Sequence, residues 1–458
     1  MSMNNPVIHK QTEAELALAD LFAKAQQATA PDLKALREAS FARFKSKGLA
    51  HKRIESWHYT DWRSAQAQLY PIVNAPDADQ MKTLADQISD LQPLAQNTLR
   101  LVLVDGVFVP GLSASALPSG VTLTSLSQAL ATGHKLSRDV LVASALGETD
   151  SMLSLNAALA NEGVLIEIAQ GAKIEQAIEL IFIGSGVKAR SLFSRSAVFM
   201  SAGSELRLIE RHVNAGIAMQ SNQALYFNLA KGARLDHLLV CDQGDVSSLD
   251  LMSLMARLEA GADYSTLSLM LGSALRRRQS FVQIAGEEAR FHASGVNLIN
   301  RKDHLDLTFS VEHLSPHCES REFFNSIIDD QATGVFQGRV SVAREAQKTD
   351  GRMKSRAILL SPEASMLNKP ELEIFADDVA CGHGATCGEL DQDQLFYAQA
   401  RGIARPEAEA ILLEGFAAEI FDDVKDEFVK EALRAQIRRW LVQRAESASA
   451  SSTRTGHA

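Results

Sequence analysis

Cysteine is scarce in this chain. Its 458 residues include four cysteines, Cys241, Cys318, Cys381 and Cys387. Small secreted proteins often depend on many disulfides, and so few thiols in so long a chain do not form such a framework. We therefore expect free thiols in a reducing compartment, most simply the cytoplasm.

Long apolar runs are missing as well. A transmembrane helix requires about 18 or more apolar residues in a row, and the sequence has no such stretch. The first residues, MSMNNPVIHKQTEAEL, lack the apolar segment of a secretory signal. The sequence therefore predicts no membrane association and no secretory signal.

An excess of positive charge is also absent. The net charge is −10, from 46 lysines and arginines against 56 acidic residues. A general nucleic-acid binder needs a basic face, so we expect no nucleic-acid partner. A local basic run, Arg276–Arg278, is interpreted as a solvated strand edge rather than as a phosphate site.

The motifs of several enzyme classes do not occur. Gly184–Lys188 is glycine-rich but lacks the GxxxxGK[ST] spacing that wraps a phosphate in backbone amides. No HExxH, GxSxG or paired CxxC motif is present. We predict that the chain alone does not hydrolyse ATP.

Helix signals fill the first zone, residues 1–95. Thr12 and Glu15 form a capping-box pattern ahead of apolar residues at helical spacing. This zone also contains three clustered aromatic residues, for which we predict a small satellite core rather than a base-stacking platform. These residues are Trp57, Tyr59 and Trp62.

Strand signals dominate the middle zone, residues 96–390. Asp105-Gly106 separates two short apolar runs, Leu101–Val104 and Val107–Val109, and this arrangement predicts a β-hairpin. A helix-like stretch near Ser151–Ala160 follows the hairpin.

A repeat then begins within this zone. Five glycines each precede a segment of alternating apolar and polar residues, at intervals of 25 to 32 residues. Glycine supplies a tight corner, and the alternation supplies one buried face. Such a period favours a solenoid of strands, a β-helix, over an ordinary β-sandwich with regular turns. The glycines are Gly171, Gly203, Gly232, Gly261 and Gly286.

The last zone, residues 391–445, is helical again. Asp391 is a predicted N-cap, Gly402 a predicted stop, and Pro406 a predicted start of the next helix. The tail, 446–458, is small and polar, and we predict that it is disordered.

Cys381 and His383 are the candidate metal ligands. Two residues apart on a strand, they point to the same face, and thiolate and imidazole are natural ligands for iron and zinc. Gly382 and Gly384 leave room for a partner, and Cys387 is a possible third ligand. A closed zinc site needs four ligands, so an open or shared site is expected. The alternative is an inert glycine-rich turn, which the spacing alone favours.

Two acidic pairs allow a second interpretation. Carboxylates in a β-helix can serve sugar chemistry, and a carbohydrate-active β-helix enzyme is therefore the alternative function. Adjacent strand residues point to opposite faces, however, so we interpret both pairs as solvated loop carboxylates. The pairs are Asp329-Asp330 and Asp377-Asp378.

The remaining histidines and cysteines are interpreted as structural. Cys241 and Cys318 are predicted to be small buried hydrophobic residues rather than reactive thiols. A lone histidine is more often a satisfied structural residue than a ligand. The histidines concerned are His292, His304, His313 and His317.

The stretch KPELEIFADDVACGHGATCGELDQDQLFYAQARGI, residues 369–403, resembles the signature of the SufB/SufD family of iron–sulfur cluster assembly scaffold proteins. Further matching segments lie at 55–60, 101–113, 155–158 and 320–374, so the resemblance spans residues 48 to 425 in the family's order. It fits the SufD branch, because the SufB branch usually reads EHEAT where this chain reads CGHGAT.

The resemblance implies a mainly β fold with helical ends. A right-handed parallel β-helix core, 96–390, would lie between an N-terminal helical domain, 1–95, and a C-terminal helical domain, 391–445. It implies a non-catalytic scaffold that supports cluster assembly and iron acquisition. The partners would be SufB, through the β-helix, and the SufC ATPase, through the C-terminal helices. A homodimer is possible for the isolated chain.

The resemblance also assigns the metal ligands. His383 matches the histidine at the interface with SufB, and Cys381 matches the cysteine two positions before it. Transient iron or a nascent cluster would be shared there with SufB, with none tightly bound by the isolated chain. The chain departs from many relatives at Gly382, where serine is expected, and at Cys387, where an aliphatic residue is common.

Overall fold

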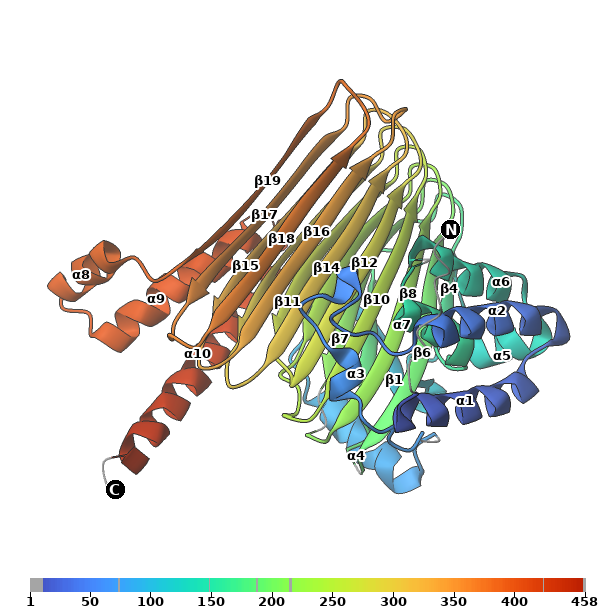
Figure 1. Cartoon of the computed structure of the whole chain (residues 1–458), viewed down its shortest axis with the longest axis horizontal. Coiled ribbons are helices and arrows are strands. Elements are labelled where there is room, and N and C mark those ends of the chain that lie inside the picture. Colours follow the sequence, from blue (N-terminus) through green and yellow to red (C-terminus); the bar gives the residue numbers. More distant parts are fainter. Residues whose placement is uncertain are drawn as a thin grey trace, which may run out of the picture.

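The computed structural model describes residues 11–72, 75–147, 149–186, 188–213, 216–422 and 424–455. Two long sheets form the body of the molecule, and helices gather at its two ends (Figure 1). The ten-stranded sheet has the order β19-β17-β15-β13-β11-β9-β7-β5-β1-β2, and the nine-stranded sheet has the order β18-β16-β14-β12-β10-β8-β6-β4-β3.

From β4 onward, consecutive strands alternate between the sheets, and each pairs in parallel with the strand two places later. This is the topology of a β-helix, and the β-sandwich alternative is wrong. The strands are β4 Val164–Ile168, β5 Ala177–Ile183, β6 Arg190–Met200, β7 Glu205–Val213, β8 Met219–Leu229, β9 Arg234–Cys241, β10 Leu249–Leu258, β11 Asp263–Leu271, β12 Leu275–Ile284, β13 Arg290–Ile299, β14 His304–His313, β15 Glu319–Ile328, β16 Thr333–Val342, β17 Asp350–Leu359, β18 Ser365–Ile374 and β19 Ala380–Gly388.

The first strands start the two sheets. β1 (Thr98–Val104) and β2 (Val107–Phe108) form the predicted antiparallel hairpin, and β3 (Val121–Ser125) pairs with β4. Asp105 and Gly106 both adopt positive φ, 50° and 84°, which is the backbone of a tight hairpin turn. The hairpin prediction is confirmed.

Only the early corners of the solenoid use glycine at positive φ. Four of the five repeat glycines have φ between 64° and 68°, but Gly286 does not. A Cβ on Gly286 would lie 1.9 Å from the backbone nitrogen of Ala260, so glycine permits a close backbone contact there. At later corners, residues other than glycine adopt the left-handed conformation. The spacing of glycines therefore does not reveal the later repeats. These residues are Glu288, Arg301, His317, Asp330 and Lys348.

The solenoid interior is the main core. On β14, alternate residues Leu305, Leu307, Phe309 and Val311 are buried and belong to one cluster with inward residues of both sheets. A single coil cannot bury such a face, so each coil depends on its neighbours.

Seven helices in residues 13–159 cover the outer faces of the sheets. They are α1 Glu13–Ala25, α2 Pro31–Lys47, α3 Trp62–Ala65, α4 Ala78–Ser89, α5 Leu126–Thr132, α6 Lys135–Val142 and α7 Ser151–Leu159. α4 packs on β1 and β5 of the ten-stranded sheet, and the other helices pack on the nine-stranded sheet. The capping box of Thr12 and Glu15 is present. Asn156 of α7 donates hydrogen bonds to the carbonyls of Ser194 and Asn222, which fixes this helix to β6 and β8. The helices α5, α6 and α7 come after residue 95 in the chain, so they lie inside the zone that the sequence predicts as β-rich.

The predicted aromatic satellite core packs on the solenoid. Trp57 and Trp62 are buried, with ring centroids 6.4 Å apart, and share a cluster with Leu249, Leu251 and Leu275. The interpretation of these two tryptophans as a small core is confirmed, while Tyr59 is only half-buried.

The interpretation of Arg276–Arg278 as a solvated strand edge is wrong. Arg276, Arg277 and Arg278 are 4 %, 0 % and 4 % exposed. β12 lies inside the nine-stranded sheet between β10 and β14. One of its faces borders the solenoid interior and the other lies under the N-terminal helices, as in parallel sheets that are buried on both sides.

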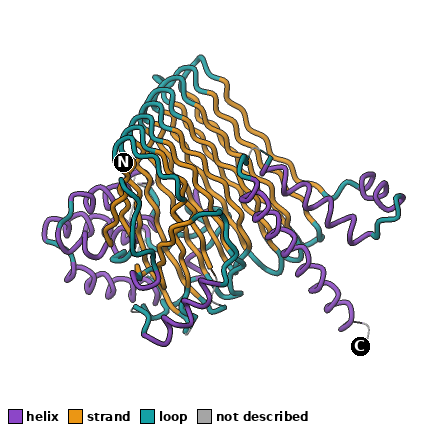
Figure 2. Tube along the Cα trace, turned by 180° about the vertical axis from the view of Figure 1, so that it is seen from behind, coloured by secondary structure: helices purple, strands orange, loops and turns teal. Residues whose placement is uncertain are grey.

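Three helices follow β19: α8 Gln392–Ala400, α9 Arg405–Ala418 and α10 Glu427–Thr455. Asp391 accepts hydrogen bonds from the first turn of α8. Seen from behind, α9 and α10 lie across the ten-stranded sheet (Figure 2), and their apolar residues join those of β13 and β15. α10 continues to Thr455, whereas the sequence predicts a disordered tail from residue 446 onward. Alanine is a strong helix former, and extending an existing helix by one residue costs little free energy. Residues 456–458 lie outside the described part.

Within the described residues, no helix is both long and apolar enough to cross a membrane.

Candidate functional site

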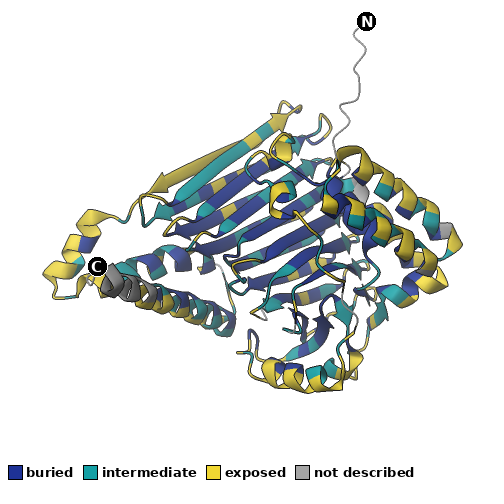
Figure 3. Cartoon of the chain, turned by 60° about the horizontal axis from the view of Figure 1, so that its bottom comes forward, coloured by how far each residue is buried: buried dark blue, intermediate teal, exposed yellow. Residues whose placement is uncertain are grey.

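The solenoid ends without a cap at β18 and β19. β18 pairs with β16 and β19 pairs with β17, and each is the last strand of its sheet. Figure 3 shows these strands in the colours of intermediate and exposed residues, whereas the strands behind them are largely buried. Their outer edges present backbone groups that pair with no other strand of the described chain. Such edges are templates for pairing with another chain.

Cys381 and His383 lie on β19, as the sequence predicts. They and Cys387 occupy alternate positions, and their register partners on β17 are buried residues along the solenoid interior: Gly351, Met353 and Ala357. The three β19 side chains therefore continue the inward face at the point where no further coil covers it. Cys381 is half-buried, while His383 and Cys387 are exposed.

Cys381 is held against the core. It packs on the interior apolar cluster, and its neighbour Gly351 has no side chain; a Cβ at Gly351 would lie 3.5 Å from Cys381 Sγ. Burial raises the pKa of the Cys381 thiol, and the charge of Asp350 adds to that effect. A thiol must lose its proton to bind a metal, so this site favours the protonated form until a cation arrives.

The chain alone does not close a metal site at β19. No three His, Cys, Asp or Glu side chains within the described ranges lie close enough together to hold one ion. His383 and Cys387 are four residues apart on an extended strand, roughly 13 Å at the usual rise. Cys387 therefore does not complete a site with His383 within this strand alone, and its role as a further ligand in a shared site stays a prediction.

Sequence reasoning missed Glu322. This residue of β15 is fully buried, and both its carboxylate oxygens lack hydrogen-bond partners among the described residues. Burial raises its pKa to about 8. The register aligns Glu322 with Met353 and then His383, so the carboxyl lies two strands beneath the candidate site, with β17 between them. Its inward position in an alternating strand was the signal available in the sequence.

The acidic pairs do not form a catalytic couple. Asp329 is buried and pairs with Arg444 of α10, so its interpretation as a solvated carboxylate is wrong. Asp378 is exposed and pairs with Lys348, and Asp330 and Asp377 are exposed as predicted.

Cys241 and Cys318 are buried as predicted. Burial raises the pKa of both thiols, that of Cys241 to about 12. His304 is satisfied by Thr60, 2.9 Å away. His313 differs, because both its ring nitrogens lack partners in the described structure and burial lowers its pKa to about 4. It stays neutral in the core, and the expectation of a satisfied histidine is wrong there.

Two protein families match the chain. The family described as the SufBD core domain of SUF system FeS cluster assembly matches residues 182–416. The SufBD protein N-terminal region matches residues 12–180. Together these matches cover the N-terminal helices, the solenoid and the first two helices after it.

The chain is also similar to individual known proteins. It is 29% identical over 396 residues to the iron–sulfur cluster assembly protein SufD of Escherichia coli (strain K12), across 85% of this chain and 89% of that protein. It is 26% identical over 392 residues to the SufBD family protein slr0076 of Synechocystis, across 82% and 84%. It is 26% identical over 452 residues to the chloroplastic protein ABCI7 of Arabidopsis thaliana, across 95% and 91%.

Proposed function

Because the chain belongs to the SufB/SufD family of iron–sulfur cluster assembly proteins, we propose that it is a cytoplasmic, non-catalytic scaffold subunit of a complex with SufB and SufC. It supports cluster assembly and iron acquisition, and iron is the cargo of the complex rather than a resident cofactor. The observation that carries the proposal is the uncapped solenoid end, where two open strand edges lie beside Cys381 and His383.

The open strand edges are the proposed surface for SufB. An edge strand gains affinity from main-chain hydrogen bonds when a partner strand adds to it. Ile374 and Phe375, at the end of β18, are exposed apolar residues beside this edge. They supply surface that a partner would remove from water. In the absence of SufB, a second copy of the chain can occupy the same edges as a homodimer.

Cys381 and His383 offer one thiolate and one imidazole at this surface. Both ligand types suit iron, and two ligands leave coordination positions open for groups of SufB. Loss of the thiol proton on binding makes iron capture weaker in acid. SufC would supply the ATP-driven change of shape that opens or closes the shared surface.

The C-terminal helices are the proposed surface for SufC. Phe396 and Tyr397 of α8 are 73% and 61% exposed, and Ile411 of α9 is also exposed. Aromatic residues are enriched among the residues that dominate binding energy at protein interfaces. Phe396→Ser should weaken capture of SufC in a pull-down, whereas Val246→Ser, at an exposed apolar residue of the solenoid, should not. Equal capture by both variants would reject this surface.

The SufB edge is tested on the backbone itself. The Ala380 N–H donates to the carbonyl of Thr349, directly before β17, so by alternation the Ala385 N–H points outward. Ala385→Pro removes that donor, whereas Ala385→Ser keeps it. We expect only the proline variant to lose co-purification with SufB. Retained pairing would contradict the edge model.

The ligand role is tested in the assembled complex. His383→Ala should leave the complex with SufB and SufC intact but lower its content of iron and acid-labile sulfide after anaerobic purification. His58→Ala, at another exposed histidine, is the control and should keep the wild-type content. Full cluster yield from the His383→Ala complex would reject a ligand role for His383.

A further inference from the structure

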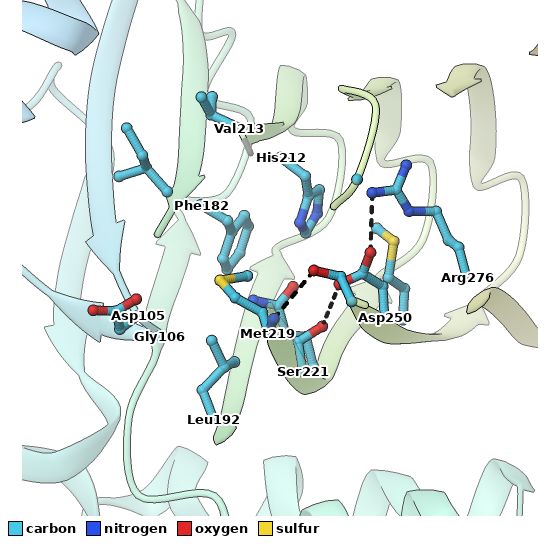
Figure 4. Close-up of a pocket in the computed structure, with 15 residues that line it drawn as sticks. Asp105, Gly106, Phe182, Leu192, His212, Val213, Met219, Ser221, Asp250 and Arg276 are labelled. Carbon is cyan, nitrogen blue, oxygen red and sulfur yellow. Dashed lines mark hydrogen bonds and ion pairs between the residues drawn. The ribbon is translucent and has the colours of Figure 1, made fainter. Parts of the chain in front are cut away.

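The middle of the solenoid interior is polar. Figure 4 shows Asp250 joined to Ser221 and Arg276, with Phe182 and His212 nearby. Two cavities adjoin here, with about 530 and 330 Å³ of empty space, their mouths included. Their shared walls include Phe182 and inward residues of β8 and β10. The region lies far along the chain from the residues of β19.

Three consecutive arginines of β12 have different surroundings here. Arg276 pairs with Asp250 at 3.0 Å, and Arg277 pairs with Asp306 on the other face of the sheet. Arg278 forms no hydrogen bond and no ion pair with any described residue, although it is only 4% exposed. The fold therefore provides a carboxylate for two of the three guanidinium groups and leaves the third alone.

Arg278 points into the solenoid. Its register partners, Met252 on β10 and Leu307 on β14, belong to the interior apolar cluster. Its side chain lines the second cavity together with Gln223 and Glu210. A guanidinium has five N–H donors and no acceptor, so these donors face the cavity without a protein acceptor.

Glu210 does not serve as the missing partner. One of its oxygens lies 2.7 Å from His212 Nε2 and the other lies 3.1 Å from His237 Nε2. The two histidines hold this carboxylate on the opposite sheet, where their interaction lowers its pKa against the effect of burial. Its two oxygens thus lie against the histidines, and it forms no ion pair with Arg278.

Further unpartnered polar atoms lie near Arg278. Ser280 Oγ, two residues along the inward face of β12, and Gln223 Oε1 both lack hydrogen-bond partners in the described structure. A hydroxyl can donate, and a glutamine amide can turn its NH₂ toward a ligand. An isolated buried charge is strongly unfavourable unless it is paired, so this group of donors requires an acceptor from outside the chain.

We propose that Arg278 binds a small monovalent anion, a halide or hydrosulfide, inside the solenoid. One unpaired positive charge matches one negative charge, and the cavity, which is lined by side chains of both sheets, has room for an ion of this size. The proposal goes beyond the assembly function and does not depend on it, because it concerns neither Cys381 nor any partner.

Bromide is the probe for this site. Crystals of the full chain soaked in sodium bromide should show an anomalous peak within hydrogen-bonding distance of the Arg278 guanidinium. Bromide at surface sites with none at Arg278 would overturn the proposal, and this test requires no variant. Displacement of that peak by anaerobic hydrosulfide, or by chloride alone, then identifies the source of the anion.

A variant pair gives an independent measurement. At constant ionic strength, replacing gluconate with bromide in the buffer should raise the Tm of the wild-type chain. It should also raise the Tm of the control Arg257→Gln, which changes a partly exposed arginine on the surface. The same exchange should leave the Tm of Arg278→Gln unchanged. An equal rise in all three proteins would show that bromide acts elsewhere and would overturn the assignment.

Discussion

The guanidinium of Arg277 lies 3.9 Å from the centre of the Trp57 ring. Arg277 also pairs with Asp306, which accepts a hydrogen bond of 2.5 Å from Thr60 Oγ1. A residue in the middle of the solenoid thereby joins the segment between α2 and α3 to β12 and β14. This buried contact fixes the N-terminal helices to the coils.

Asp306→Asn should be strongly destabilising. The change leaves Arg277 as a buried charge without its partner, and removing one member of a buried pair typically costs about 3–5 kcal/mol. Chemical denaturation of the purified chain measures this loss. Asp61→Asn, at a half-buried N-cap on the same segment, should cost little, because asparagine and aspartate cap helices about equally well. Similar losses for both variants would contradict the central role of the Arg277 contact.

Gly286→Ala should disrupt the solenoid. The added Cβ would lie 1.9 Å from the backbone nitrogen of Ala260, so two coils must separate. Gly203→Ala meets open space and suffers only from positive φ, a strain of about 1 kcal/mol. Thermal unfolding should therefore show a much lower Tm, or no soluble protein, for the first variant alone. A mild effect at Gly286 would mean that the coils can move apart.

Glu322→Gln should change how stability depends on pH. Burial raises the pKa of Glu322 from 4.5 to about 8 in the folded chain. The unfolded chain therefore loses this proton first, and the wild type loses stability as pH rises from about 4.5 to about 8. The full effect is on the order of 5 kcal/mol. Below pH 4.5 the carboxyl is protonated in both states and contributes no such loss.

Unfolding free energies at pH 5 and pH 8.5 test this expectation. The decline between these two values should be smaller in Glu322→Gln than in the wild type. Glu319→Gln changes a partly exposed carboxylate on the same strand and should keep the wild-type decline. Parallel pH profiles for wild type and Glu322→Gln would show that the buried carboxyl is not responsible.

Asp329→Asn should loosen α10. The ion pair of Asp329 with Arg444 fixes the distal part of this helix to the turn after β15. Arg444 is partly exposed, so we expect a loss of about 1 kcal/mol and faster hydrogen exchange in α10. Asp330→Asn, at the exposed neighbour, should leave exchange in α10 unchanged. Unchanged exchange in both variants would mean that the apolar contacts of α10 suffice.

Local structure was predictable where a residue type strongly favours one backbone conformation or one capping role. Asp105-Gly106 predicts its hairpin because both residues tolerate positive φ, and Thr12 with Glu15 predicts a helix start because each caps the other. The glycine repeat predicts a solenoid from its early corners. It misses the later ones, because Arg301 and Asp330 adopt the same backbone shape without being glycine.

Burial was harder to predict than secondary structure. Alternation shows which residues of a strand share a face, but it does not show what covers that face. Arg277 and its partner Asp306 are 29 residues apart in sequence and adjacent in register. Glu322 lies beneath His383 for the same reason. Both relations arise only when successive coils stack.

The amino-acid sequence by itself determined the succession of helices and strands, the corners that glycine allows and the positions of Cys381 and His383 on a strand, because these depend on neighbours a few residues away. The tertiary structure decided that β19 has no further coil beyond it, that Glu322 is buried and that Arg278 has no carboxylate, because each of these depends on which strands stack against which and where the stack ends.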